Sequence, residues 1–234
     1  MDEHAIRAAV RERYARAATT GESCCGDAPV KIFADREVTD DLLGPSLGCG
    51  TPVEAAGLQP GETVVDLGSG TGRDVFLAAE RVGPTGRVIG VDMTPEMVAK
   101  ARRAASALGI SNAEFRLGEI EHLPLPDGIA DAVISNCVIN LLPDKRPAFA
   151  EAFRVLRPGG RLVISDVVSR QPLPESFKSA ATWAACLAGA IPEGDYLGQV
   201  RAAGFTDVEV LARRSYTGDD LFSITLRAGK PAGQ

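Results

Sequence analysis

The chain has 234 residues, of which 45% are hydrophobic and 24% charged, so it can form one α/β domain with a sizeable core. A net charge of −6 without a Lys/Arg-rich cluster argues against a nucleic-acid partner. The first residues are acidic with no apolar run behind them, and no stretch approaches the roughly 18 apolar residues that span a membrane. We therefore expect a cytoplasmic protein without a membrane partner.

The amino-terminal part divides into a helix and an irregular segment. Ile6, Val10 and Tyr14 recur at helical spacing, which predicts an amphipathic helix over residues 3–18. Residues 19–62 are rich in Gly, Pro and Asp and hold three of the five cysteines. We interpret residues 1–61 as a helix followed by a cysteine-containing cap.

From residue 62 onward, apolar runs typical of strands alternate with amphipathic stretches. The predicted strands are residues 63–67, 87–91, 113–117, 130–135 and 161–167. The predicted helices are residues 72–82, a helix that begins at Pro95 with Thr94 as N-cap, and residues 144–156, stopped by Pro158-Gly159-Gly160. This alternation predicts a doubly wound, mostly parallel sheet in a core of residues 62–170.

The last segment, residues 171–234, combines helical and strand patterns. Residues 175–203 read as mostly helical, with an interruption near Pro192. Two strands at about 207–215 and 221–228 surround a turn sequence, which predicts an antiparallel hairpin that closes the sheet.

A glycine-rich loop follows the first predicted strand, in Asp66-Leu67-Gly68-Ser69-Gly70-Thr71-Gly72. Such a loop allows close approach of a ligand, although a tight turn without a ligand is the plain alternative. A nicotinamide dinucleotide would require glycine where this chain has Arg73. The carboxylate of Asp66 suits a cationic ligand, such as the ammonium group of an amino acid, better than a pyrophosphate.

Two further positions fit an adenosine-containing ligand. Asp92 ends the second strand, where an acid accepts hydrogen bonds from ribose hydroxyls, and Glu119-Ile120 follows the third, where an adenine can bind. Together these features resemble the class I S-adenosylmethionine methyltransferases, which implies a Rossmann-like seven-stranded sheet with an antiparallel last strand. The resemblance implies S-adenosylmethionine as methyl donor, S-adenosylhomocysteine as product, and cofactor contacts from Asp66, Gly68, Ser69, Gly70, Gly72, Arg73, Asp92, Met93, Glu119, Ile120 and Asn136.

The cysteines indicate the methyl acceptor. Their odd number argues against a disulfide framework, and no C-x-x-C pair supports a zinc site. Cys137 follows the fourth strand, where it is either a buried core residue or a ligand-facing thiol. Cys49 lies between two glycines and Cys186 in a run of small residues. Three separated thiols favour a soft, thiophilic substrate.

Longer motifs resemble the bacterial arsenite methyltransferases from about Ser23 to beyond residue 200. The matching stretches are Gly48-Cys49-Gly50, DLGSGTGRD at 66–74, VIGVDMTPEM at 88–97, Gly118-Glu119-Ile120-Glu121, SNCVINL at 135–141 with Pro143-Asp144-Lys145, residues 154–160, Ser165-Asp166-Val167 and Cys186-Leu187-Ala188-Gly189-Ala190. The resemblance implies that Cys49, Cys137 and Cys186 bind trivalent arsenic as a thiol adduct. It also implies arsenic detoxification or volatilisation.

The resemblance extends to redox chemistry and has departures. Methylation formally oxidises arsenic, so we expect dependence on a cellular thiol reductant such as glutathione or thioredoxin. Cys24 and Cys25 match an upstream cysteine that the family uses in thiol exchange, and this pair either relays those electrons or is a mere surface pair. Ala185 stands where relatives often have an acid, and Ser46-Leu47 where eukaryotic relatives often have an aromatic pair.

Two other functions stay open at this level. A methyltransferase for a carbon or oxygen nucleophile would need a positioned base, for which Glu121 and His122 are the nearest candidates. A non-enzymatic arsenic-binding protein could retain a vestigial cofactor loop.

Overall fold

The fold was analysed in a computed structural model that describes residues 2–20, 48–217 and 220–233. A seven-stranded sheet has the order β3-β2-β1-β4-β5-β7-β6, and β7 runs antiparallel to both of its neighbours. The strands are β1 (Thr63–Leu67), β2 (Arg87–Asp92), β3 (Ala113–Leu117), β4 (Ala130–Asn136), β5 (Leu156–Ser169), β6 (Thr206–Thr217) and β7 (Leu221–Gly229). The predicted α/β fold with its antiparallel C-terminal hairpin is confirmed.

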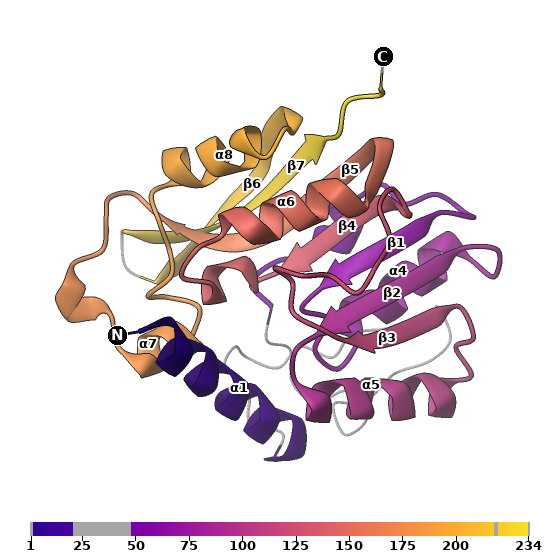
Figure 1. The fold of residues 1–234 in the computed structure, drawn as a ribbon, viewed down its shortest axis with the longest axis horizontal. Helices are drawn as coiled ribbons and strands as arrows, with labels where there is room; N and C mark the ends of the chain where they lie inside the picture. Colours follow the sequence, from indigo (N-terminus) through magenta and orange to yellow (C-terminus); the bar gives the residue numbers. More distant parts are fainter. Residues whose placement is uncertain (1, 21–47, 218–219, 234) are drawn as a thin grey trace.

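Helices cover both faces of this sheet (Figure 1). Apolar side chains of α6 (Arg146–Val155) and α8 (Glu193–Ala202) form the core on one face, and those of α3 (Pro52–Ala55), α4 (Arg73–Val82) and α5 (Pro95–Leu108) form it on the other. Because both faces are covered, the central strands are buried nearly throughout, which explains apolar runs such as Val64-Val65.

One edge of the sheet gathers the carboxyl ends of the parallel strands, and a helix lies across it. The arrowheads of β1 to β4 point toward the side where α1 (Glu3–Thr20) and α7 (Ala180–Ala184) lie (Figure 1). The helix α1 packs against both α5 and α7. Ile6 and Val10, two residues of its predicted apolar face, are buried. The amino-terminal helix therefore closes the edge where an open α/β sheet binds ligands.

The start of β5 differs from the sequence prediction. The helix α6 ends at Val155, and Leu156 already has an extended backbone and pairs with Ala130. An irregularity in the β4–β5 register accommodates the residues between Leu156 and Arg161, so the Pro158-Gly159-Gly160 stretch lies within the strand. The helix therefore ends one residue before the predicted residue 156, but the predicted strand start at residue 161 was wrong. Pairing with β4 and with the segment after β7 outweighs the turn preference of this stretch.

The segment between β5 and α8 contains less helix than predicted. Only the short helices η2 (Glu175–Phe177) and α7 precede α8, and residues 185–192 are not helical. One further 3-10 helix, η1 (Ile139–Leu141), follows β4. Across the described parts of the chain, no helix is both long and apolar enough to cross a lipid bilayer. The predicted boundaries at residues 61/62 and 170/171 stay predictions.

Candidate functional site

A pocket lies at the carboxyl ends of β1, β2 and β4, beneath α1. It contains most of the positions predicted to contact the cofactor. Its lining residues include Arg7, Val10, Tyr14, Gly48, Asp66, Gly68, Ser69, Gly70, Arg73, Asp74, Asp92, Met93, Ile120, Glu121, Asn136 and Val138.

The glycine loop after β1 is folded tightly against the end of β2. Gly68, Gly70 and Gly72 have φ angles of 68°, 52° and 95°, which an L side chain rarely adopts. The amides of Gly68 and Ser69 both donate to the carbonyl of Val91, at 2.8 and 3.0 Å. The Asp92 carboxylate accepts from the amides of Gly70 (2.9 Å) and Thr94 (2.8 Å). Asp92 therefore holds the glycine loop in place and also lines the pocket.

Buried carboxylates give this pocket an acidic character. Burial, followed by the neighbouring charges of Asp74 and Asp92, raises the pKa of Asp66 well above its ordinary value. Burial also raises the pKa values of Asp74 and Asp92. A cationic ligand would relieve these penalties. The Ser69 hydroxyl lines the same pocket and has no hydrogen-bond partner in the described structure, so it is available to a polar ligand.

The acids after β3 are arranged differently from the prediction. Glu119, expected to contact an adenine, is half exposed and pairs with Arg7 at 3.2 Å, whereas Ile120 and the buried Glu121 line the pocket. Glu121 also pairs with Arg7, at 2.6 Å. Sequence reasoning missed Arg7 because 114 residues separate it from Glu121 and no local motif joins them.

Asn136, at the end of β4, connects the pocket to the cysteine loop. Its side-chain oxygen accepts from the amides of Cys49 (3.0 Å) and Gly50 (3.2 Å). Its side-chain nitrogen donates to the Gly50 carbonyl and to the Asp74 carboxylate, both at 2.9 Å. A side chain at Gly48 would collide with the Asn136 amide, so the glycine permits the loop to lie this close. Asn136 therefore positions Cys49 beside the pocket, and a direct cofactor contact stays a prediction.

Three thiols from distant segments converge next to this pocket. The sulfurs of Cys49 and Cys137 and a carboxylate oxygen of Asp166 all lie within 4.8 Å of one another. The Cys186 thiol donates to the Cys137 carbonyl at 3.1 Å. All three cysteines are free of disulfides; Cys137 and Cys186 are buried, and Cys49 is half-buried. Cys24 and Cys25 lie outside the described residues.

Two of the three thiols sit on an unusual backbone conformation. Cys137 and Cys186 have φ angles of 60° and 61°, in the left-handed region that non-glycine residues rarely occupy. Cys186 follows the end of α7. Its backbone amide donates to the carbonyl of Trp183, and the backbone amide of Leu187 donates to the carbonyl of Thr182. These bonds form a Schellman motif in which Cys186 takes the usual glycine position. Strain of this kind is tolerated at functional sites.

The pKa values of the two buried thiols, Cys137 and Cys186, are both raised. For Cys137, a hydrogen bond from Cys186 lowers the pKa. A hydrogen bond to Cys49 and burial raise the pKa by more than this, so it lies well above its ordinary value. For Cys186, the hydrogen bond to Cys137 and then burial raise the pKa well above its ordinary value. The surroundings of Cys137 and Cys186 therefore favour the neutral thiol over the buried thiolate.

A buried polar network lies behind the thiols. Burial raises the pKa of Asp166 to about 6, although the charge of Lys145 and a hydrogen bond from Tyr196 lower it. Burial lowers the pKa of Lys145 to about 8. The Asp166 carboxylate accepts from the Tyr196 hydroxyl and the Asn140 amide, both at 3.0 Å. The family motifs contain Asp166, Lys145 and Asn140 but not Tyr196, and they did not predict the contact of Asp166 with the thiols.

The alternative that requires a positioned base finds no support here. His4 and His122 are the only histidines in the sequence, and both are exposed and absent from the pocket lining. Glu121 lines the pocket, but its carboxylate is ion-paired with Arg7.

Comparison with known proteins adds to this geometry. A family model described as "Methyltransferase domain" matches residues 58–213. An arsenite methyltransferase of Halobacterium salinarum is 43% identical over 99% of this chain and 68% of its own length. Another, from Aquipseudomonas alcaligenes, is 44% identical over 73% of this chain, and the match spans 51% of that relative.

A solved structure resembles the whole described fold. The crystal structure of an arsenic(III) S-adenosylmethionine methyltransferase from Chlamydomonas reinhardtii matches with a TM-score of 0.77 at 37% identity. The match covers 100% of this chain and 76% of that protein.

The strained backbone of Cys186 gives a testable consequence for stability. We expect Cys186→Gly to be about 1 kcal/mol more stable than Cys186→Ala, because only glycine adopts the left-handed position without cost. Both variants remove the sulfur, so urea denaturation of the pair isolates the backbone effect. Equal stability, or a more stable alanine variant, would show that this residue carries no strain.

Proposed function

This chain belongs to the family of S-adenosylmethionine-dependent arsenite methyltransferases, and we propose that it methylates trivalent arsenic held by Cys49, Cys137 and Cys186. The observation that carries the proposal is the convergence of three thiols, none of them in a disulfide, beside an acid-lined pocket. The methylated products would serve arsenic detoxification or volatilisation.

The acid-lined pocket fits the methyl donor. S-adenosylmethionine, when bound, supplies an electrophilic methyl group on a positively charged sulfur. The carboxylates of Asp74 and of the buried Asp66 and Asp92 favour a cation in this pocket. The free hydroxyl of Ser69 offers a hydrogen bond to a polar ligand. Glu121 and Ile120 lie where an adenosine would extend beneath α1.

The thiol cluster fits arsenite because neutral thiols exchange with neutral arsenous acid to give a neutral product. Each hydroxyl of arsenous acid leaves as water with the proton of one thiol, so three As–S bonds form without net charge. The raised pKa values of Cys137 and Cys186 keep these protons in place until the exchange. No catalytic base is required, in agreement with a pocket that contains no histidine among its described lining residues.

Three sulfur ligands leave the arsenic lone pair free to accept the methyl group. Orienting that lone pair is the main contribution of the protein, and orientation of this kind can supply roughly 7–11 kcal/mol of a barrier. The link from Asn136 to both Cys49 and Asp74 keeps the acceptor and donor sites in register.

Methylation converts the lone pair into an As–C bond and so oxidises arsenic formally from the trivalent state. Two thiolates that leave as a disulfide return two electrons to arsenic. A thiol of the reductant, after losing its proton to solvent, then fills a vacated position and restores a neutral trivalent methylarsenical. The disulfide must then be reduced, so we propose that glutathione or thioredoxin is required and that Cys24 and Cys25 exchange disulfides during turnover. This need for reduced thiols favours action in the cytoplasm.

The proposed function is tested by incubating the protein with labelled S-adenosylmethionine, arsenite and a thiol reductant. We expect labelled methylarsenicals from the wild type, and a loss of about a hundredfold or more from Cys137→Ser and from Cys186→Ser because each removes an arsenic ligand. Asp195→Asn, an exposed change on α8, serves as the control. Methyl transfer that survives both cysteine changes would contradict arsenic ligation by these residues.

The protonated thiols give a second expected result. Calorimetric titration of arsenite at neutral pH should give the same enthalpy in phosphate and in Tris buffer, because the displaced hydroxides consume the thiol protons. Cadmium(II) is the control, since a cation that binds thiols releases their protons to the buffer. An arsenite enthalpy that depends on the buffer would show that the thiols are ionised beforehand.

A further inference from the structure

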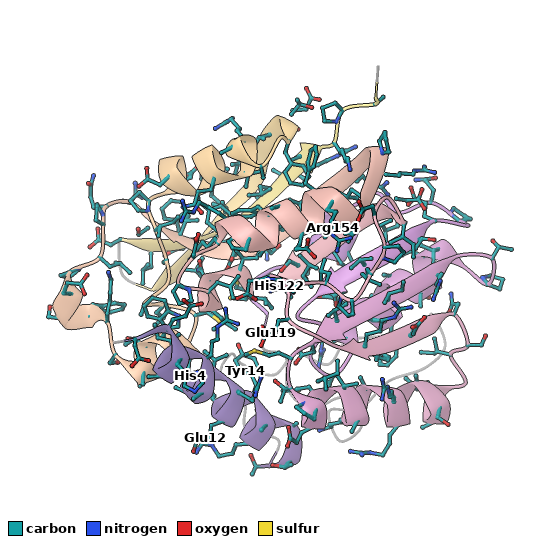
Figure 2. The ribbon with its side chains drawn as sticks, in the orientation of Figure 1. His4, Glu12, Tyr14, Glu119, His122 and Arg154 are labelled. Carbon is teal, nitrogen blue, oxygen red and sulfur yellow. The ribbon has the colours of Figure 1, made fainter. Side chains whose placement is uncertain are left out.

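Tyr14 joins the two halves of the site. It belongs to α1, lines the acid-lined pocket, and packs in the apolar cluster that contains Cys137 and Cys186. Its hydroxyl oxygen lies 3.5 Å from the Cys186 sulfur. Figure 2 shows Tyr14 on the side of α1 that faces the body of the protein, whereas Glu12 lies on the outer side of the same helix.

The direction of this hydrogen bond follows from the other contacts of Cys186. A thiol has one proton, and the Cys186 sulfur donates to the Cys137 carbonyl at 3.1 Å. Its lone pairs are then left to accept the proton of the Tyr14 hydroxyl. When arsenic replaces the thiol proton, the sulfur can only accept, so the phenol remains the donor in the loaded state.

Two sets of contacts fix α1, and with it the position of the hydroxyl. Arg7, two turns before Tyr14, pairs with the buried Glu121 at 2.6 Å and with Glu119 at 3.2 Å. The helix also packs against α7, the element whose carboxyl end presents Cys186. The helix α1 therefore holds the Tyr14 hydroxyl, the end of α7 holds the Cys186 sulfur, and the hydrogen bond between them restrains both groups.

We propose that Tyr14 is a positioning residue for the third arsenic ligand. Its hydroxyl donates to the Cys186 sulfur and holds that sulfur toward Cys137, so that all three thiols face one arsenic atom. Cys186 needs this restraint because its backbone is strained and because its hydrogen bond to the Cys137 carbonyl is lost when arsenic replaces the thiol proton. The proposal rests on the proposed arsenic methylation and names a residue of α1 that the three thiols depend on.

Tyr14→Phe removes the hydroxyl and keeps the ring in the pocket. We expect the KM for arsenite to rise about tenfold, the effect of one hydrogen bond to a sulfur that carries partial negative charge. The KM for S-adenosylmethionine should change by less than about twofold, because the ring still lines the pocket. Glu12→Gln, an exposed change on the same helix, should leave both values unchanged.

A direct arsenic readout separates positioning from a merely structural role. Arsenite bound to thiolates absorbs in the near ultraviolet, so a titration gives both affinity and the amount bound. We expect Tyr14→Phe to shift the midpoint about tenfold toward higher arsenite while the final amplitude stays the same, because all three sulfurs are still present.

Three different results would overturn either the role of Tyr14 or the proposed arsenic methylation, and each points to one of them. If the wild type methylates arsenite and Tyr14→Phe matches it in both assays, Tyr14 does not position Cys186. If Tyr14→Phe weakens S-adenosylmethionine as much as arsenite, the role of the hydroxyl is to hold the fold. If the wild type binds arsenite but transfers no methyl group to it, the proposed function is wrong, and the absorbance titration still tests Tyr14.

Discussion

The Asn136 side chain holds the Cys49 loop against the wall of the acid-lined pocket, and the rest of the site depends on this link. Its two donor hydrogens and its acceptor oxygen are all engaged, with Cys49 and Gly50 on one side and Asp74 on the other. An amide used so completely has little freedom to move. The link sets how far the loop of one thiol lies from the pocket proposed for the methyl donor. The remaining thiols come from the end of β4 and the end of α7, and both lie on a left-handed backbone conformation.

Charge explains why such a site can be buried. Three thiolates side by side in a low-dielectric interior would repel one another and lose their hydration, and the upward pKa shifts of Cys137 and Cys186 express that cost. Neutral thiols avoid the cost, and neutral arsenous acid exchanges with them without creating charge. The acids of the neighbouring pocket work in the opposite direction, because they favour a cation. The two compartments therefore differ in what they bind, one a neutral thiophilic atom and the other a positively charged donor.

Sequence patterns predicted the sheet, the glycine loop and the acids of β1 and β2 because each depends on short-range periodicity or on a local motif. The beginning of β5 was mispredicted, since the turn preference of Pro158-Gly159-Gly160 is local while pairing with Ala130 is not. The partners of Arg7, Tyr14 and Asp166 share the same difficulty: each contact joins segments far apart in the chain. The left-handed conformation of Cys186 also escaped prediction, because a Schellman motif is normally recognised by its glycine.

The most direct test of arsenic ligation by the three thiols is X-ray absorption spectroscopy of the arsenite-loaded wild type and of Cys49→Ser. Three converging thiols predict a first shell of three sulfur atoms around arsenic in the wild type. The Cys49→Ser protein should show two sulfur atoms and one oxygen, because Cys137 and Cys186 remain in place. An arsenic atom that keeps oxygen ligands in the wild type, or a sulfur shell that is unchanged in the variant, would contradict a site in which all three thiols hold the methyl acceptor.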